Sequence, residues 1–155
     1  MLPTDAYRSK LHDTIAALRY WVPTLRHAAD VEDVETETYW RIAVRPRVRA
    51  ACPFELILHS DQTYDLLIAG EAFERQPVES LASFQPLLEA ISSGRAVTRI
   101  WRAPTTGSVK AVETIVTLAD GTIWQRLRTL VGGRGSSAGD WIATDRRYVP
   151  YAREA

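Results

Sequence analysis

Residues 95–131 restrict the fold more than any other segment, because apolar and polar residues alternate there in three runs. The runs are 97–102, 111–118 and 122–130. Asp120-Gly121 stands between the last two, and an Asp-Gly pair between β-rich runs predicts a hairpin. The turn needs a positive φ, which glycine adopts without steric cost. We therefore expect two or three consecutive antiparallel strands in this segment.

Two segments have the apolar spacing of amphipathic helices, residues 5–22 and 78–93. Pro23 ends or kinks the first helix because it has no backbone N–H, and residues 23–29 are expected to form a second short helix. Gly94 is the expected left-handed cap of the later helix, and Pro86 predicts a break within it. The apolar stripes are Tyr7, Leu11, Ile15, Leu18, Val22 and Leu25, and then Leu81, Phe84, Leu88 and Ile91.

More strands are expected between these helices. Residues 39–48 alternate, and Pro46 indicates an edge strand. Residues 54–59 and 63–69 predict a second hairpin that turns at 60–62. The acidic run 30–37 is interpreted as a linker or the lead-in to a strand. Arginines of the edge strand either meet an anionic partner or guard the edge and pair with nearby acids. These arginines are Arg41, Arg45, Arg47 and Arg49.

This order of elements predicts an α+β protein. We expect an antiparallel, meander-rich sheet of five to seven strands, with the N-terminal helix and the middle helix packed on one face. The length of 155 residues predicts a single domain spanning residues 1–155. Four glycines between Gly132 and Gly139 predict a flexible loop over 132–140. After a short return strand at 141–143, residues 150–155 are expected to form a tail.

Composition narrows the classes of function. The 19 basic and 19 acidic residues give zero net charge, which argues against binding nucleic acid or membranes by bulk charge. No apolar run approaches the roughly 18–20 residues that cross a bilayer. A single cysteine, Cys52, excludes an intramolecular disulfide, and the first residues lack the pattern of a signal peptide. We therefore expect a small soluble cytoplasmic protein.

Motifs for cofactors and metals are missing from the sequence. The glycines of 132–139 lack the Lys-Ser or Lys-Thr of a phosphate-binding loop. His12, His27 and His59 have no second ligand at zinc spacing, and the acidic run lacks the glycine of a calcium loop. We expect no cofactor and no metal.

Tryptophan and arginine gather in the predicted meander. Alternation puts Arg99 beside Trp101 on one strand, and Arg126 and Arg128 beside Trp124 on another. A sheet face of aromatic and arginine side chains binds anionic or stacking ligands. These five residues are therefore the candidate ligand-binding site. The alternative is that the tryptophans cap the core and the arginines pair with acids such as Glu113.

The favoured function is a binding module that holds a protein or an anionic ligand through this sheet face. A second hypothesis is a small pocket enzyme with Asp65 or Glu71 as its general base. A third is a single-stranded nucleic-acid binder, which the zero net charge disfavours. A protein partner, a homo-oligomer and an anionic small molecule all remain open as partners, whereas a membrane is not expected.

Overall fold

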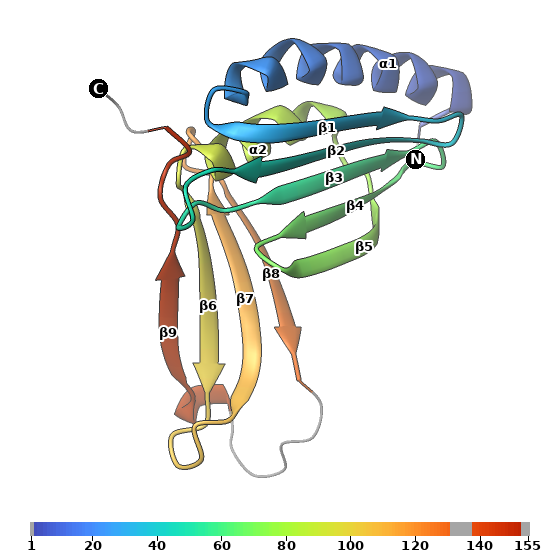
Figure 1. Cartoon of the computed structure of the whole chain (residues 1–155). Helices are drawn as coiled ribbons and strands as arrows, with labels where there is room; N and C mark the ends of the chain where they lie inside the picture. The colour runs from blue at the N-terminus through green and yellow to red at the C-terminus, as the bar shows by residue number, and fades with distance from the viewer. Residues whose placement is uncertain (1, 131–137, 153–155) are drawn as a thin grey trace.

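A computed structural model describes residues 2–130 and 138–152 and confirms the α+β class, with two antiparallel sheets (Figure 1). The helices are α1 (Thr4–Trp21) and α2 (Phe84–Ser92), with 3-10 turns at Val22–Leu25, Leu81–Ser83 and Ala138–Asp140. The first sheet has the order β1-β2-β3-β4-β5, and its strands are Ala29–Glu35, Tyr39–Pro46, Phe54–His59, Thr63–Ile68 and Glu71–Pro77. The second has the order β8-β7-β6-β9, and its strands are Ile123–Thr129, Val109–Thr117, Ala96–Arg102 and Ile142–Arg147.

Both helices lie on one face of the first sheet, as expected, and the second sheet extends away from this body as an arm (Figure 1). Tyr7, Ile15 and Leu18 of α1 are buried, which confirms the predicted stripe. The core is one cluster that joins α1, α2, the first sheet and the near ends of β6 and β7. Among the described residues, no helix is long and apolar enough to cross a membrane.

Two sheets replace the single sheet that the sequence predicts. The N-terminal and middle helices, the 54–69 hairpin and the meander are all confirmed. The break in the middle helix falls between Ser83 and Phe84, where a 3-10 turn meets α2. Because α2 separates β5 from β6, the chain leaves the edge of the first sheet and begins a new one. The return strand, β9, is longer than expected and pairs with β6.

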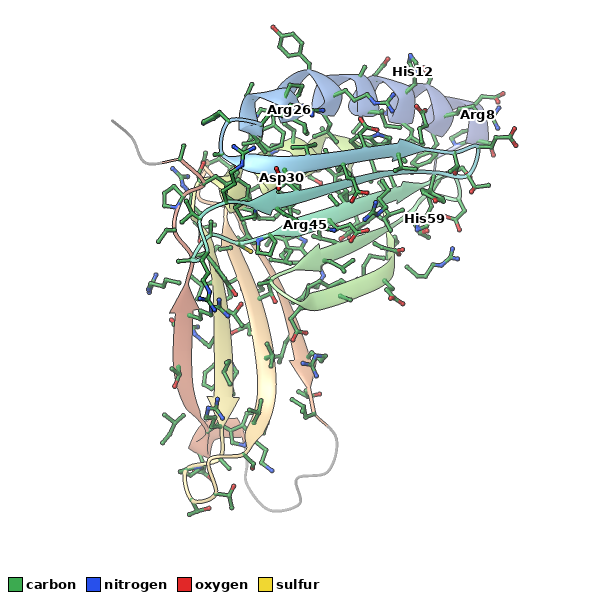
Figure 2. The ribbon with its side chains drawn as sticks, viewed as in Figure 1. Arg8, His12, Arg26, Asp30, Arg45 and His59 are labelled. Atoms are coloured by element: carbon green, nitrogen blue, oxygen red, sulfur yellow. The ribbon has the colours of Figure 1, made fainter. Side chains whose placement is uncertain are left out.

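The acidic run is itself a strand. β1 pairs with β2 along its whole length, so β2 is an interior strand and the prediction of an edge strand there is wrong. Figure 2 shows Asp30 and Arg45 on these neighbouring strands, where they are partners in the register. The arginines of β2 pair with the acids of β1, as the sequence indicates: Glu32 lies 3.7 Å from Arg41 and 3.8 Å from Arg45. A strand of one charge is therefore stabilised by its oppositely charged neighbour.

Asp33 connects α1 to the first sheet. Its carboxylate accepts two hydrogen bonds from Arg19 of α1, each 2.9 Å long. It also accepts a 2.8 Å hydrogen bond from the indole Nε1 of Trp40, a residue that is 1% exposed. The hydrogen bonds from Arg19, aided by the one from Trp40, outweigh burial and lower the pKa of Asp33. Asp33 thus gives the buried Trp40 indole N–H an acceptor and also ties α1 to the first sheet.

The predicted glycine turns are present. Gly121 has φ +87° in the β7–β8 hairpin, where the Leu118 N–H donates to the Thr122 carbonyl over 2.8 Å. Gly94 has φ +80° and ends α2 in a Schellman arrangement, because the Arg95 N–H donates to Ala90 and the Gly94 N–H to Ile91. β5 was missed by the sequence analysis.

We expect Asp33→Ala to lower the free energy of unfolding by about 1–3 kcal/mol, because it leaves the Trp40 indole N–H without its partner. Urea denaturation measures this change. The control is Glu35→Ala, which removes a second, more exposed partner of Arg19 and should cost less than about 1 kcal/mol. Equal effects of the two variants would contradict this role of Asp33.

Gly94→Ala should destabilise the protein more than Gly70→Ala. Both glycines have positive φ, so alanine costs about 1–2 kcal/mol at either place. At Gly94 an added Cβ would also lie 2.7 Å from the backbone nitrogen of Pro150, whereas at Gly70 it meets nothing within 4 Å. Thermal denaturation of the two variants measures this difference, which reports how tightly the C-terminal segment packs on the end of α2. Equal losses of thermal stability in the two variants would show that the C-terminal segment moves aside to make room for the added Cβ.

Candidate functional site

The strand register divides the predicted site between two faces. Arg99 is opposite Glu113 and Trp101 is opposite Ala111, whereas Arg126 is opposite Thr114 and Trp124 is opposite Val116. Directly paired residues share a face, and neighbours along a strand alternate. Arg99 and Trp101 therefore lie on one face of the second sheet, and Trp124, Arg126 and Arg128 lie on the other. The five residues do not form one surface.

Arg99 is neutralised by acids of its own sheet. Its guanidinium donates to both carboxylate oxygens of Asp145 on β9, over 2.8 and 3.1 Å, and lies 3.9 Å from Glu113. The hydrogen bond to Asp145 raises the pKa of Arg99. The alternative expectation, an arginine that pairs with acids, therefore describes Arg99.

Arg128 joins the two sheets. It donates two hydrogen bonds, 2.8 and 2.9 Å long, to the carboxylate of Glu71 on β5. Close by, the ring of Phe73 on β5 meets that of Trp124 edge to face, with ring centres 5.5 Å apart. An ion pair and an aromatic pair thus set β8 against β5. These two contacts also occupy Arg128 and one edge of Trp124.

Arg126 differs from the other two arginines because it takes part in none of the ion pairs between described residues. Its guanidinium carbon lies 4.7 Å from the centre of the Trp124 ring. One nitrogen donates to the carbonyl of Gln125 over 2.9 Å, and another lies 3.5 Å from the Tyr64 hydroxyl, at the outer limit of a hydrogen bond. Most of its donors therefore have no acceptor within residues 2–130 and 138–152.

A cleft of about 180 Å³ opens where Arg126 lies, between the two sheets and the start of α2. Tyr64 of β4 and Phe84 of α2 meet edge to face in its wall, with ring centres 5.0 Å apart. These two aromatic side chains in the cleft with Arg126 thus come from a strand, β4, and a helix, α2. Its lining comprises Tyr64, Pro77, Glu79, Ser80, Ser83, Phe84, Leu87, Leu118, Thr122, Ile123, Trp124 and Arg126.

The cleft has the chemistry of an anion site with apolar walls. Arginine offers planar pairs of donors that match a carboxylate, and the cation–π contact with Trp124 restrains the Arg126 guanidinium. The Tyr64 hydroxyl faces a donor on Arg126, so its own hydrogen is available to a ligand. Within 2–130 and 138–152, no group of three His, Cys, Asp or Glu side chains is placed to hold a metal ion.

The carboxylates considered as general bases have other partners. Asp65 accepts the Arg75 N–H over 2.8 Å and lies 3.0 Å from Nε2 of His59. Burial alone would raise the pKa of Asp65, but these two hydrogen bonds, together with the charges of His59 and Arg75, lower that pKa. A base that works near neutral pH needs a raised carboxyl pKa. Glu71 is held by Arg128. The geometry thus gives the enzyme hypothesis little support.

The sequence analysis missed the His59–Asp65 pair and Tyr64. The pairing of Leu58 with Tyr64 places His59 and Asp65 diagonally on one face, so the predicted hairpin register was the available signal. Nothing in the local sequence indicates that Tyr64 lines the cleft, because its neighbours there come from α2 and β8. The predicted loop 132–140 lies mainly outside the described residues.

Two of the larger grooves lack such convergence of groups. One, of about 550 Å³, runs beside the start of α1 and includes Lys10, Asp13 and Gln62. The Gln62 amide is engaged there, donating to the Leu2 carbonyl over 2.7 Å. The other, of about 690 Å³, lies beside the C-terminal segment and is lined mainly by neutral side chains.

Comparisons of the chain with protein-family models, with curated proteins and with solved structures found no match.

Cys52 should not react with Ellman's reagent in the native protein. Its side chain is fully buried, and burial raises the pKa of the thiol to about 12, so almost no thiolate forms near neutral pH. We expect labelling only as fast as the protein unfolds, and complete labelling in denaturant. In a Ser60→Cys control, the added exposed thiol should react at once while Cys52 stays protected. Rapid labelling of native Cys52 would contradict this burial.

Proposed function

We propose that this protein binds a small organic monocarboxylate with a flat apolar body in the cleft between its two sheets. The observation that carries the proposal is the state of Arg126. Arg99 and Arg128 are paired with acids, whereas Arg126 lines the cleft without a carboxylate partner among the described residues. A cation in a partly apolar site attracts an anion more strongly than it would in open water.

Size and charge narrow the ligand class. The volume of about 180 Å³ is below the roughly 300 Å³ of ordinary small-molecule sites, which favours a ligand of few atoms. Tyr64, Phe84 and Trp124 favour a planar apolar body. Glu79 also lines the cleft, and its negative charge disfavours a dianion. A monocarboxylate fits these conditions better than a phosphate.

The nucleic-acid hypothesis loses support from the same geometry. A stacking platform needs aromatic and basic side chains on one exposed face. Here Trp101 and Trp124 lie on opposite faces of the second sheet, and Arg99 and Arg128 are held by Asp145 and Glu71.

Benzoate is the probe for this site, with benzamide as its uncharged counterpart. Isothermal titration should detect benzoate and not benzamide. Arg126→Gln should weaken benzoate binding roughly tenfold to a hundredfold, because charge-assisted hydrogen bonds contribute about 1.5–3 kcal/mol. Phenyl phosphate, a dianion, should bind less tightly than benzoate.

Arg99→Gln is the matched control, because it removes the same charge from the other face of the same sheet. It should leave benzoate binding unchanged. Full binding by Arg126→Gln, or loss of binding in Arg99→Gln, would overturn the assignment of the cleft. Equal binding of benzoate and benzamide would overturn the role of charge.

A further inference from the structure

The outer edge of β8 is an open strand edge. β8 pairs with β7 on one side, and no other strand among the described residues pairs with its opposite side. Ile123 and Leu127 lie on β8 and are 56% and 58% exposed. Its seven residues pair with β7 in continuous register, without a bulge. A regular edge with exposed apolar side chains is a template for another strand.

The other three sheet edges carry protection that β8 lacks. β1 presents a run of acids, and β9 includes Asp145, Arg146 and Arg147. The register of β5 shifts against β4, and Arg75 of β5 has φ +53°. Charges and irregular backbone both oppose pairing between molecules. β8 has two arginines, but Arg128 is bound to Glu71, and the Arg126 guanidinium lies over Trp124 with one nitrogen on the Gln125 carbonyl.

The hydrogen bonds between β8 and β7 determine which backbone groups of β8 face β7 and which face outward. The Leu130 N–H donates to Lys110, and the Leu118 N–H donates to Thr122. Hydrogen bonding alternates along an antiparallel strand, so the even-numbered residues face β7. The N–H and C=O groups of Ile123, Gln125, Leu127 and Thr129 therefore point outward. The Gln125 carbonyl already accepts one hydrogen bond from Arg126, over 2.9 Å, so pairing with another strand uses its second lone pair.

We propose that two copies of this chain associate by antiparallel pairing of their β8 strands about a two-fold axis at Gln125. In this register Ile123 of one copy lies opposite Leu127 of the other, on the sheet face that carries Arg99. Trp124 lies opposite Arg126 of the other copy on the cleft face. Each apolar side chain thus meets an apolar one, and each tryptophan meets a cation. The contact is self-complementary, as a two-fold interface requires.

Two neighbouring registers keep the outward groups paired, one with its axis at Trp124 and one with its axis at Arg126. The register at Trp124 sets Ile123 against Gln125 and so loses the contact with Leu127. The register at Arg126 has a further cost. It sets two Arg126 side chains directly opposite each other, and like charges in that position are destabilising. It also places Ile123 against Thr129 and Leu127 against Gln125. The pattern Ile-Trp-Gln-Arg-Leu is matched to itself only around Gln125.

Light scattering coupled to size-exclusion chromatography tests the association with the whole chain. We expect wild type to run as a dimer whose fraction falls on dilution. Ile123→Lys should weaken the dimer at least tenfold, because it sets a charge against Leu127 of the other copy. Thr144→Lys, a lysine on the opposite sheet edge, is the matched control and should remain dimeric. Circular dichroism verifies that each variant is folded.

A charge pair tests the register. Leu127→Glu alone should also favour the monomer, whereas Ile123→Lys with Leu127→Glu should restore the dimer, because Lys and Glu then face each other twice. The register centred on Arg126 predicts no rescue. A wild-type monomer at every concentration, or a dimer unaffected by Ile123→Lys, would overturn the association. A dimer that Ile123→Lys weakens and the double variant does not restore would overturn the register.

Discussion

The contact between β5 and β8 holds the arrangement on which the candidate site depends. Glu71 pairs with Arg128, and Phe73 packs against Trp124, so the second sheet meets the first at a fixed place. An ion pair with one half-exposed partner contributes about 1 kcal/mol or less, and the aromatic pair about 0.5–1.5 kcal/mol. Their effect is therefore on orientation more than on stability. With Arg128 and Trp124 held in this way, Arg126 faces Tyr64 and Phe84 across the cleft.

Much of the fold follows from local patterns. The alternation after residue 95, the Asp120-Gly121 turn and the α1 stripe each gave the correct element. The acidic strand β1 was not evident, because strand propensity does not favour a run of acids. It forms because β2 supplies the opposite charges and because Trp40 and Arg19 meet at Asp33. The division into two sheets was also hidden, because it depends on where α2 and Gly94 direct the chain.

The site was predictable only within each strand. Alternation correctly put Arg99 beside Trp101 and Arg126 beside Trp124. It could not relate the two pairs, because that depends on the register of both strands with β7, and a shift of one residue reverses a face. The acids that engage Arg128 and Arg99 lie 57 and 46 residues away in the sequence. Only the three-dimensional arrangement distinguishes the unpaired arginine from the paired ones.

The central claim is that ligand chemistry belongs to the cleft face of the second sheet. The most direct measurement is a nitrogen–proton correlation spectrum during a benzoate titration, since each of the five tryptophans gives its own indole N–H signal. We predict that the Trp124 signal moves in a saturable way while that of Trp101, on the opposite face, stays fixed. Movement of Trp101 without Trp124, or five fixed signals at saturating benzoate, would contradict it.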